Sequence, residues 1–331
     1  MNLIKVMADK FGLSPDFVQK TISFAPRSYK RFEISKKNGQ KRTVYQPARK
    51  VKLLQSFVSD EIIKRFPLHP AVFSYREGLS IRDNAEQHRR NNYLLRLDFR
   101  NFFESIEIKD VIQFFIRNVK NAPFVLSHDD ILLLSQLCCF RADDGKLRVV
   151  IGAPSSPSIA NAILYDFDVE VFDHCKSQGI IYTRYADDLY FSTNHQNLLS
   201  KIPEFVSRVL SQTSSPRLMI NEKKTYHTSK KHRRIVTGLT ITSENRISIG
   251  RDRKREIRTL VFKCISNSID IDKKEYLRGL LSYVSSVDPD FFFSLLRKFG
   301  EDAIYSIQKN QPQSDRNVLS TEESDSGEFP F

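Results

Sequence analysis

Three aspartates border apolar, β-rich segments of this sequence, and they restrict the folds that the chain can adopt. Residues 93–99 form an apolar run that contains Asp98, and Asp187 and Asp188 lie between the β-rich runs 180–185 and 189–192. These compositions predict a buried strand and a β-hairpin with the acid pair at its tip. A carboxylate beside buried strand residues is unfavourable unless a positive charge or hydrogen bonds compensate it. The fold must therefore supply such compensation to the three acids.

Two kinds of group commonly compensate buried acids: a Lys or Arg side chain, or a hard cation. Mg²⁺ binds carboxylate oxygens and retains water or substrate phosphate as its other ligands. Two such ions, about 3.5–4 Å apart, stabilise the attacking and leaving oxygens of an in-line phosphoryl displacement. The alternative is an ordinary polar turn at 187–188 and an acid at a strand end at 98. The apolar strands around the acids and the basic character of the chain favour the metal interpretation.

The net charge of the chain points toward a polyanionic partner. The sequence has 52 Lys and Arg against 39 Asp and Glu, a formal net charge of +13. Between residues 222 and 258, twelve basic residues face four acidic ones. Clustered positive charge is typical of proteins that neutralise nucleic-acid phosphates. The alternative is that the charge serves solubility alone.

The composition is that of a globular protein, with 40% hydrophobic and 27% charged residues. No apolar run approaches the roughly 18 residues of a membrane-spanning helix, and residues 1–10 lack the apolar core of a signal peptide. The four cysteines form no C-x-x-C pair. We therefore expect a reduced, cytoplasmic protein without a membrane partner.

Apolar periodicity predicts helices over residues 51–66, 111–119, 155–167 and 199–210, and a mainly helical region over 252–299. Ser155 is expected to cap the third of these helices, with Pro157 in its first turn. Two further strands are expected over 235–241 and 246–249. Helices and strands mix without a regular βαβ alternation, which predicts an α+β fold.

The segments around the three aspartates resemble motifs of a known family. Tyr185-Ala186-Asp187-Asp188 resembles the Y-x-D-D hairpin of reverse transcriptases, and Leu97-Asp98-Phe99 resembles the strand with their first metal-binding aspartate. Residues 152–161 resemble the family's loop and helix that support template and incoming nucleotide. Residues 220–225 resemble the later lysine motif, and residues 42–47 resemble the fingers strand. The resemblance spans residues 37–258.

The resemblance implies a right-hand polymerase with fingers, palm and helical thumb. Its fingers and palm would occupy residues 1–245 and its thumb residues 246–312. Residues 313–331 are rich in Ser, Glu and Asp, and this composition predicts a disordered acidic tail.

The resemblance also implies roles for the residues around the acids. Asp98 and Asp187 would bridge two Mg²⁺ ions, Asp188 would complete the acidic patch, and the carbonyl of Phe99 would be a further ligand. Lys224 would lie near the departing pyrophosphate, either as a general acid or as an electrostatic partner.

A deoxynucleotide triphosphate pocket is implied as well. Arg42 would bind phosphate with its planar guanidinium, and Gly152 would form part of the pocket. Phe103 would exclude a ribose 2′-hydroxyl. The alternative for Phe103 is packing in the core, and the alternative for Arg42 is a solvated charge on a strand. Many relatives have Gln before this glycine, whereas Ile151 stands here, so a side-chain hydrogen bond from that position is not expected.

Two shorter elements resemble those of bacterial retron reverse transcriptases. Asn84-Ala85-Glu86-Gln87-His88 matches N-A-x-x-H, and Val236-Thr237-Gly238 matches V-T-G. The resemblance gives both elements contacts with the template and priming RNA. The alternatives are a hydrogen-bonded buried histidine at His88 and a strand bulge at Gly238.

The start of the implied thumb is basic. A cationic helix suits the phosphates and 2′-hydroxyls of a product duplex; the alternative is a solvated helix face. The residues concerned are Arg251, Arg253, Lys254 and Arg255.

The retron resemblance implies RNA-directed DNA synthesis on a dedicated structured non-coding RNA. Synthesis would start from an RNA 2′-hydroxyl and leave a branched RNA-linked single-stranded DNA, with a separate effector protein acting in defence against phage. The alternatives are an enzyme of a group II intron or a diversity-generating element, a non-catalytic RNA-binding scaffold, and an RNA-directed RNA polymerase. An intron enzyme is expected to continue beyond the thumb, and Phe103 disfavours the RNA polymerase.

Overall fold

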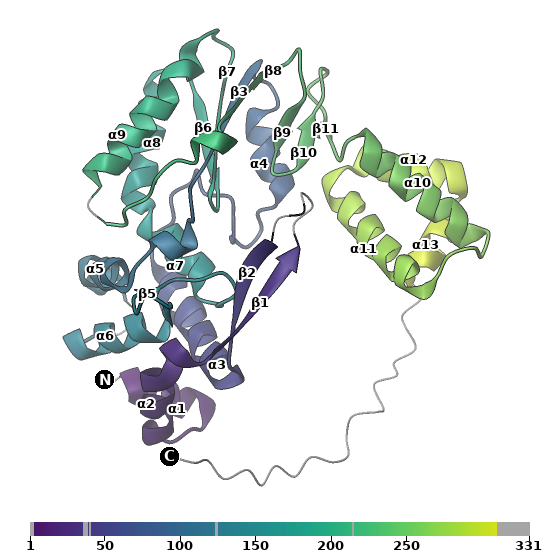
Figure 1. The fold of residues 1–331 in the computed structure, drawn as a ribbon. Helices are drawn as coiled ribbons and strands as arrows, with labels where there is room; N and C mark the ends of the chain where they lie inside the picture. The colour runs from purple at the N-terminus through teal and green to yellow at the C-terminus, as the bar shows by residue number, and fades with distance from the viewer. Residues whose placement is uncertain (1–2, 36–38, 40, 123–124, 214, 310–331) are drawn as a thin grey trace, which may run out of the picture. The chain divides into compact units, whose positions relative to one another are not determined.

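The structure is a computed structural model that describes residues 3–35, 39, 41–122, 125–213 and 215–309. The expected acidic tail over 313–331 lies outside the described residues. The chain divides into two compact units, residues 1–247 and 248–331, which are described separately below (Figure 1).

A four-stranded antiparallel sheet carries the acid-bearing strands of the first unit. Its strand order is β6 (Ile181–Tyr185), β7 (Asp188–Thr193), β3 (Tyr93–Asp98) and β8 (Tyr226–Ser229). The strand and the hairpin expected from the sequence are confirmed as β3, β6 and β7. The edge strand β8 was not predicted.

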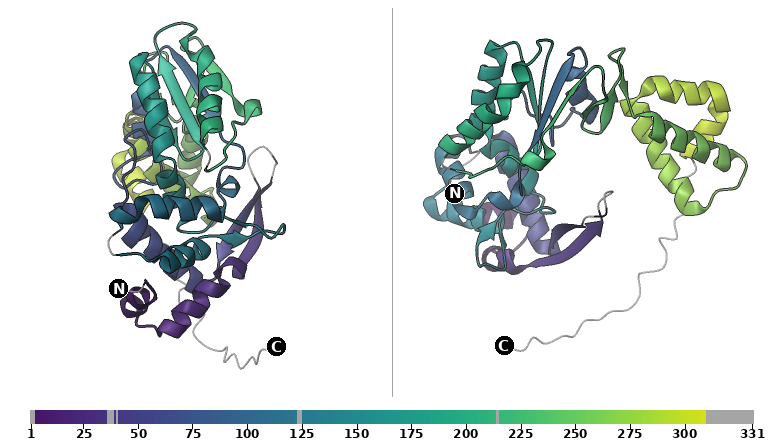
Figure 2. Two further views of the ribbon diagram at one scale, coloured as in Figure 1. Left: turned by 90° about the vertical axis from the view of Figure 1, so that its left-hand side faces the viewer. Right: turned by 45° about the horizontal axis from the view of Figure 1, so that its top comes forward.

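Helices cover both faces of this sheet (Figures 1 and 2). Because side chains alternate along a strand, Leu97 and Leu189 enter the apolar core on the side of α8 (Tyr165–Ser177) and α9 (Ile202–Gln212). The intervening residues face α4 (Ile81–His88) on the other side. That second face includes two of the three aspartates, whereas Arg184 of β6 faces Asp168 of α8 on the first side.

The remainder of the first unit is mainly helical and supports a β-ribbon (Figure 1). The ribbon is formed by β1 (Tyr29–Ser35) and β2 (Lys41–Pro47), which pair antiparallel. The helical part contains α1 (Leu3–Phe11), α2 (Pro15–Phe24), α3 (Arg49–Phe57), α5 (Ile108–Asn118), α6 (His128–Leu137), α7 (Ser156–Ile163) and the short strand pair β4 (Phe140–Arg141) and β5 (Leu147–Arg148).

Three of the predicted helices are interrupted. The helix expected over 51–66 ends as α3 at Phe57 and continues as the π-helical turn η2 (Val58–Ile62) and a 3₁₀ turn. The helix expected over 155–167 divides at Leu164 into α7 and α8. Pro157 does lie in the first turn of α7, but Ser155 is itself helical and its side chain makes no cap, because capping needs an extended backbone there. The helix expected over 199–210 begins with a 3₁₀ turn and continues as α9.

The strand expected over 235–241 is a hairpin. Its arms are β9 (Arg234–Val236) and β10 (Leu239–Ile241), joined by Thr237 and Gly238, both at positive φ. The strand expected over 246–249 is limited to β11 (Ile247–Ser248). Two left-handed residues reverse the chain tightly, which a run of β-branched residues does not reveal.

From Arg251 onward, the described elements of the second unit are helices. It contains α10 (Arg251–Ile265), α11 (Ile271–Val287), α12 (Pro289–Phe299) and α13 (Glu301–Lys309), which confirms the helical region expected over 252–299. Within the described parts of the chain, no helix has the length and apolar character that crossing a membrane requires.

Candidate active site

The pairing of three strands brings the aspartates to one end of the sheet. Tyr185 pairs with Asp188, so the hairpin turn consists of Ala186 and Asp187, with Ala186 at a φ of 56°. Asp188 pairs in turn with Asp98 of β3, and the N–H of Phe99 donates to the carbonyl of Asp187 at 3.0 Å. Main-chain hydrogen bonding alone therefore gathers acids that are far apart in the sequence.

The acids lie in an unfavourable setting for negative charge. Burial raises the pKa of the Asp188 carboxyl to about 6, although the Arg96 guanidinium opposes the shift. Burial, followed by repulsion from Asp98, raises the pKa of Asp187. Asp98 is itself buried. The ionised form of the cluster therefore needs nearby cations to offset this cost.

Two cationic side chains of the protein meet this need in part. Lys224 Nζ lies 2.8 and 2.9 Å from the two carboxylate oxygens of Asp98. Arg96 donates to Asp188 Oδ1 from Nη2 at 2.8 Å and from Nε at 3.0 Å, and Tyr190 donates its hydroxyl to Asp188 Oδ2 at 3.1 Å. Among the described residues, no other side chain forms a hydrogen bond or ion pair with the Asp187 carboxylate, which accepts only from its own main-chain N–H.

The donor chemistry fits a divalent cation at Asp98 and Asp187. These are two neighbouring carboxylates whose mutual repulsion a cation would remove, and carboxylate oxygen is the donor that Mg²⁺ prefers. Asp188 fits less well because the chelating Arg96 guanidinium and Tyr190 hold its two oxygens, whereas at Asp98 a cation would have to displace only the half-exposed Lys224 ammonium. In the described ranges, no group of three or more His, Cys, Asp or Glu side chains has the arrangement of a metal site.

A buried ion pair supports the Ala186–Asp187 turn. Arg184 is fully buried and forms an ion pair with Asp168 at 2.6 Å. It also donates to the carbonyl of Ala186 at 3.3 Å, while the N–H of Ala186 donates to Ser74 Oγ at 2.8 Å. Both main-chain groups of Ala186 are thus held. Sequence reasoning missed these residues, although an arginine within an apolar strand is a signal that it has a buried partner.

Tyr75 is a second residue that the sequence analysis missed. Its loop is bound to β6, since Phe73 N donates to Arg184 O at 2.9 Å and Arg184 N donates to Ala71 O at 2.8 Å. Tyr75 has a φ of 54° and is 55% exposed. Partial desolvation and the negative charge of Asp187 raise the pKa of its phenol. No sequence signal marked it.

Arg42 and Gly152 are both associated with the β-ribbon: Arg42 lies near its loop end and Gly152 contacts β2 at Tyr45. Arg42 is exposed on β2, and its charge acts on both Asp187 and Tyr75. Gly152 has a φ of 110°, and a Cβ at this residue would lie 2.5 Å from Tyr45 O. Tyr45 N donates to Ile151 O at 2.8 Å. The structure thus shows a packing reason for this glycine: it docks β2 against the loop.

Phe103 is half-buried at the start of a 3₁₀ turn after β3, and its ring centroid lies 5.2 Å from that of Phe102. One side of the ring packs on the core and the rest is accessible. This position accommodates both the sugar-selecting role and the packing alternative.

The N-A-x-x-H element forms most of α4, and its two polar side chains are buried. Asn84 Oδ1 accepts from Thr183 Oγ1 at 2.6 Å. His88 bonds Thr183 Oγ1 through Nε2 and Ser192 Oγ through Nδ1, both at 2.7 Å. These side chains fasten α4 to both arms of the acid-bearing hairpin and are not accessible to RNA. An effect of the element on RNA would act through the position of α4.

The V-T-G element is the β9–β10 turn. Val236 is buried, and Thr237 donates its N–H to Tyr190 and its hydroxyl to the carbonyl of Ile81, the first residue of α4. Both short elements therefore pack on the polar face of the sheet.

Within the second unit, the four basic residues expected in the thumb differ in their contacts. Arg251 and Arg255 are exposed at the start of α10. Arg253 pairs with Glu256 at 2.8 Å, and Lys254 pairs with Asp288 at 2.9 Å. The first two are therefore the better placed to meet phosphate.

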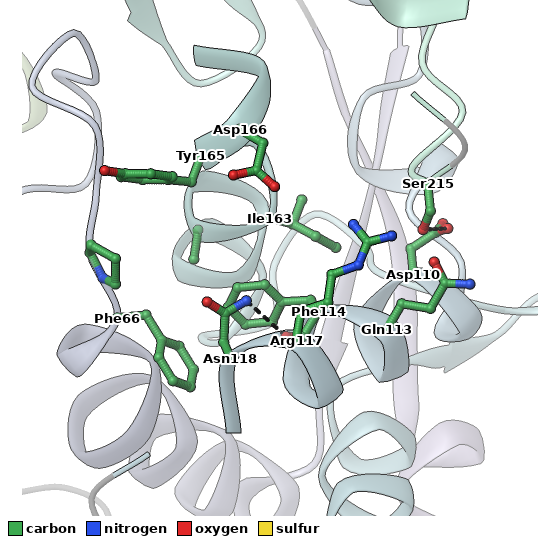
Figure 3. A pocket seen from close by; sticks show the side chains of 12 residues that line it. Phe66, Asp110, Gln113, Phe114, Arg117, Asn118, Ile163, Tyr165, Asp166 and Ser215 are labelled. Carbon is green, nitrogen blue, oxygen red and sulfur yellow. Dashed lines mark hydrogen bonds between the residues drawn. The ribbon is translucent and has the colours of Figure 1, made fainter. Parts of the chain in front are cut away.

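A cavity of about 290 Å³ lies away from the acids, between α5 and the α7–α8 junction (Figure 3). Phe66, Phe114 and Ile163 form apolar walls, and Arg117 and Asp166 supply charge. It contains none of the expected site residues.

Comparison with known proteins identifies the class. A family model described as reverse transcriptase (RNA-dependent DNA polymerase) matches residues 34–241, and the chain belongs to that family. It is accordingly an RNA-directed DNA polymerase with the α+β, right-hand polymerase fold expected from the sequence. Members of this family use divalent metal ions and an RNA template.

Curated relatives narrow the class to retron reverse transcriptases, as the two short elements indicate. The retron Ec83 reverse transcriptase of Escherichia coli is 36% identical over 298 residues, covering 89% of this chain and 94% of the relative. The retron Ec86 enzyme of the same organism is 31% identical and covers 92% of each chain. The retron Ec73 enzyme is 32% identical, covering 84% of this chain and 89% of the relative.

Proposed function

We propose that this retron enzyme adds deoxynucleotides with two Mg²⁺ ions held by Asp98 and Asp187, with the carbonyl of Phe99 as a further oxygen donor. The observation that carries the proposal is the Asp187 carboxylate, to which no other side chain of the described residues is bound, at the tip of a rigidly held turn beside buried Asp98. Bound there, the ions supply the positive charge that a transferring phosphoryl group requires.

The protein's own groups have separate tasks in this proposal. Arg42, exposed on β2 and acting on Asp187, binds the triphosphate, and Gly152 keeps β2 against the loop beneath it. Lys224 neutralises Asp98 in the metal-free enzyme and lies within reach of the pyrophosphate when the cluster is loaded. Asp188 serves as a fixed negative charge held by Arg96. This role differs from the one implied by the sequence, in which Asp188 would complete the metal-binding patch.

Two further assignments complete the proposal for the chain. Residues 1–245 form fingers and palm and residues 246–312 the thumb, and the division into compact units at 247–248 supports this boundary. Arg251 and Arg255 bind the backbone of the product duplex.

The substrate is a dedicated structured RNA that primes DNA synthesis from a 2′-hydroxyl, and a separate effector protein uses the product in defence against phage. Similarity to retron reverse transcriptases over most of the chain supports this part. Nucleic acid that co-purifies with the protein from its host tests it. DNA joined covalently to RNA supports the retron product, whereas random cellular RNA contradicts it.

The catalytic proposal is tested by Asp187→Asn on a primed RNA template with Mg²⁺. We expect this variant to lose several kcal/mol of transition-state stabilisation, so that its rate of primer extension falls by about a thousandfold. RNA binding stays unchanged, and stability at neutral pH increases because a desolvated charge beside Asp98 is removed. Asp166→Asn, an exposed acid far from the cluster, is the control. Normal extension by Asp187→Asn would refute the metal role of this residue.

A further inference from the structure

The turn between β9 and β10 has an unexpected residue at its first position. Val236 pairs with Leu239, so Thr237 and Gly238 form a two-residue turn with φ values of 47° and 83°. Such turns favour Asn-Gly or Gly-Gly. A β-branched residue in the left-handed region is a conformational outlier, and outliers persist only where surrounding contacts determine them.

Two hydrogen bonds hold Thr237 in this conformation. Its hydroxyl donates to Ile81 O at 2.9 Å, and its N–H donates to the hydroxyl oxygen of Tyr190 at 3.0 Å. Tyr190 is 1% exposed, and its ring centroid lies 6.0 Å from that of His88. The turn is therefore anchored both to α4 and to the strand β7 that follows the catalytic turn.

The same tyrosine reaches the acidic cluster. Its hydroxyl proton goes to Asp188 Oδ2 at 3.1 Å, while Arg96 binds Oδ1 at 2.8 Å. A phenol has one proton to donate and lone pairs with which to accept. The Tyr190 hydroxyl therefore accepts from the Thr237 N–H and donates to the Asp188 carboxylate, so the two hydrogen bonds form a chain. An N–H bond accepted by the hydroxyl polarises it and strengthens its donation to the carboxylate.

We propose that Tyr190 is a positioning residue that links the Val236–Gly238 turn to Asp188 and keeps that carboxylate directed at Arg96. The inference rests on the proposed role of the acidic cluster. Without the hydroxyl, Asp188 is held by Arg96 alone and can turn toward Asp98 and Asp187. A third mobile negative charge there disturbs the electrostatic arrangement at the reacting phosphate.

The first test compares Tyr190→Phe with Tyr182→Phe. Tyr182 lies in the other arm of the same hairpin, is equally buried and donates to the Asp168 carboxylate at 2.8 Å. Both variants lose one buried hydroxyl, so their thermal stabilities fall similarly. Single-turnover extension is measured per active site, after titration of the active fraction, so that partial unfolding does not lower the rate constant.

Tyr190→Phe is expected to reduce the maximal rate constant about tenfold with the KM for the nucleotide within twofold. Tyr182→Phe is expected to leave both unchanged, because Arg184 keeps its two hydrogen bonds to Asp168 without the Tyr182 hydroxyl. A wild-type rate constant in Tyr190→Phe would overturn the inference. A merely structural tyrosine would lower the titrated active fraction alone.

The second test does not use activity, so it separates this inference from the proposed function. Hydrogen–deuterium exchange of the peptide that contains Thr237 is compared in Asp188→Ala and Asp187→Ala. Each variant removes one of two adjacent acids, and of the two only Asp188 forms a hydrogen bond with Tyr190. Faster exchange of the turn in Asp188→Ala alone supports the link. Equal exchange in the two variants contradicts it, whether or not the wild-type enzyme extends a primer.

Discussion

Lys224 Nζ lies between the two carboxylate oxygens of Asp98, at 2.8 and 2.9 Å. The segment before Lys224 continues the sheet beyond β3, since Asn221 N donates to Asp98 O at 2.7 Å. The ammonium group therefore occupies the oxygens that a divalent cation would use. Lysine and metal compete for one buried acid, and the enzyme without metal is stabilised by the lysine.

We therefore expect Lys224→Gln to destabilise the metal-free enzyme by about 1–2 kcal/mol, because a buried carboxylate loses a charge-assisted hydrogen bond from a half-exposed lysine. Mg²⁺ or Mn²⁺ should raise the unfolding temperature more in Lys224→Gln than in the wild type. Circular dichroism measures both temperatures, since the chain has no Trp. An equal metal-induced shift in the two proteins would argue against shared oxygens.

Gly152→Ala is expected to move β2 away from its loop. The new Cβ would lie 2.5 Å from Tyr45 O at a φ of 110°, and strain of this kind costs about 1–3 kcal/mol. Because β2 carries Arg42, the KM for the nucleotide should rise more than the maximal rate falls. Steady-state extension kinetics measure the two effects.

Gly145→Ala is the control for this prediction. Gly145 also has a positive φ, of 79°, but its added Cβ meets nothing within 4 Å. It should lose stability without a change in KM. Equal KM values in the two alanine variants would show that the close approach at Gly152 has no bearing on nucleotide binding.

The central strands were predictable because β-branched and aromatic residues dominate them and acids mark their ends. Their pairing then fixes the meeting of Asp98 with the turn. The partners of Asp188 were not predicted because they depend on strand register, which sequence alone specifies weakly. One signal was available: Arg96 and Asp98, and likewise Asp188 and Tyr190, are two residues apart and so share a face of the sheet.

Other features depend on contacts that no local pattern encodes. The edge strand β8 is polar and forms by pairing with β3. Asn84 and His88 were expected to contact RNA, but the face of α4 that carries them packs against the hairpin, which a short polar helix does not disclose. Thr237 and Gly238 form a turn inside a run that favours strand, because tertiary hydrogen bonds outweigh the propensity of threonine.

His88 is expected to make stability depend on pH. Burial lowers the pKa of its imidazole to about 3 in the folded protein, against about 6.5 in the unfolded chain. The contribution of His88 to the free energy of unfolding is therefore fully present above pH 6.5. It decreases as the pH falls toward 3, by up to about 1.4 kcal/mol per pH unit, because only the unfolded state binds the proton. Urea unfolding between pH 4.5 and 7.5 measures this slope.

The matched variant for this prediction is His88→Gln, which keeps a polar side chain in α4 but does not titrate. The free energy of unfolding of this variant should depend less steeply on pH in the same window. The slope should be smaller by about 1.4 kcal/mol per pH unit, because unfolding no longer takes up one proton. Parallel profiles for His88→Gln and the wild type would place the pH dependence elsewhere.

Phe103→Ala tests sugar selection against core packing. If the accessible edge of the ring excludes a 2′-hydroxyl, its removal lets ribonucleotides enter, and the ratio of kcat/KM for dNTP over rNTP falls by about ten- to a hundredfold. Extension of a primed RNA template with each nucleotide type gives this ratio. Phe102→Ala is the control, since Phe102 is buried against Phe99 at 5.4 Å and its loss should reduce stability without changing the ratio. An unchanged ratio in Phe103→Ala, together with a stability loss like that of Phe102→Ala, would assign Phe103 to the core.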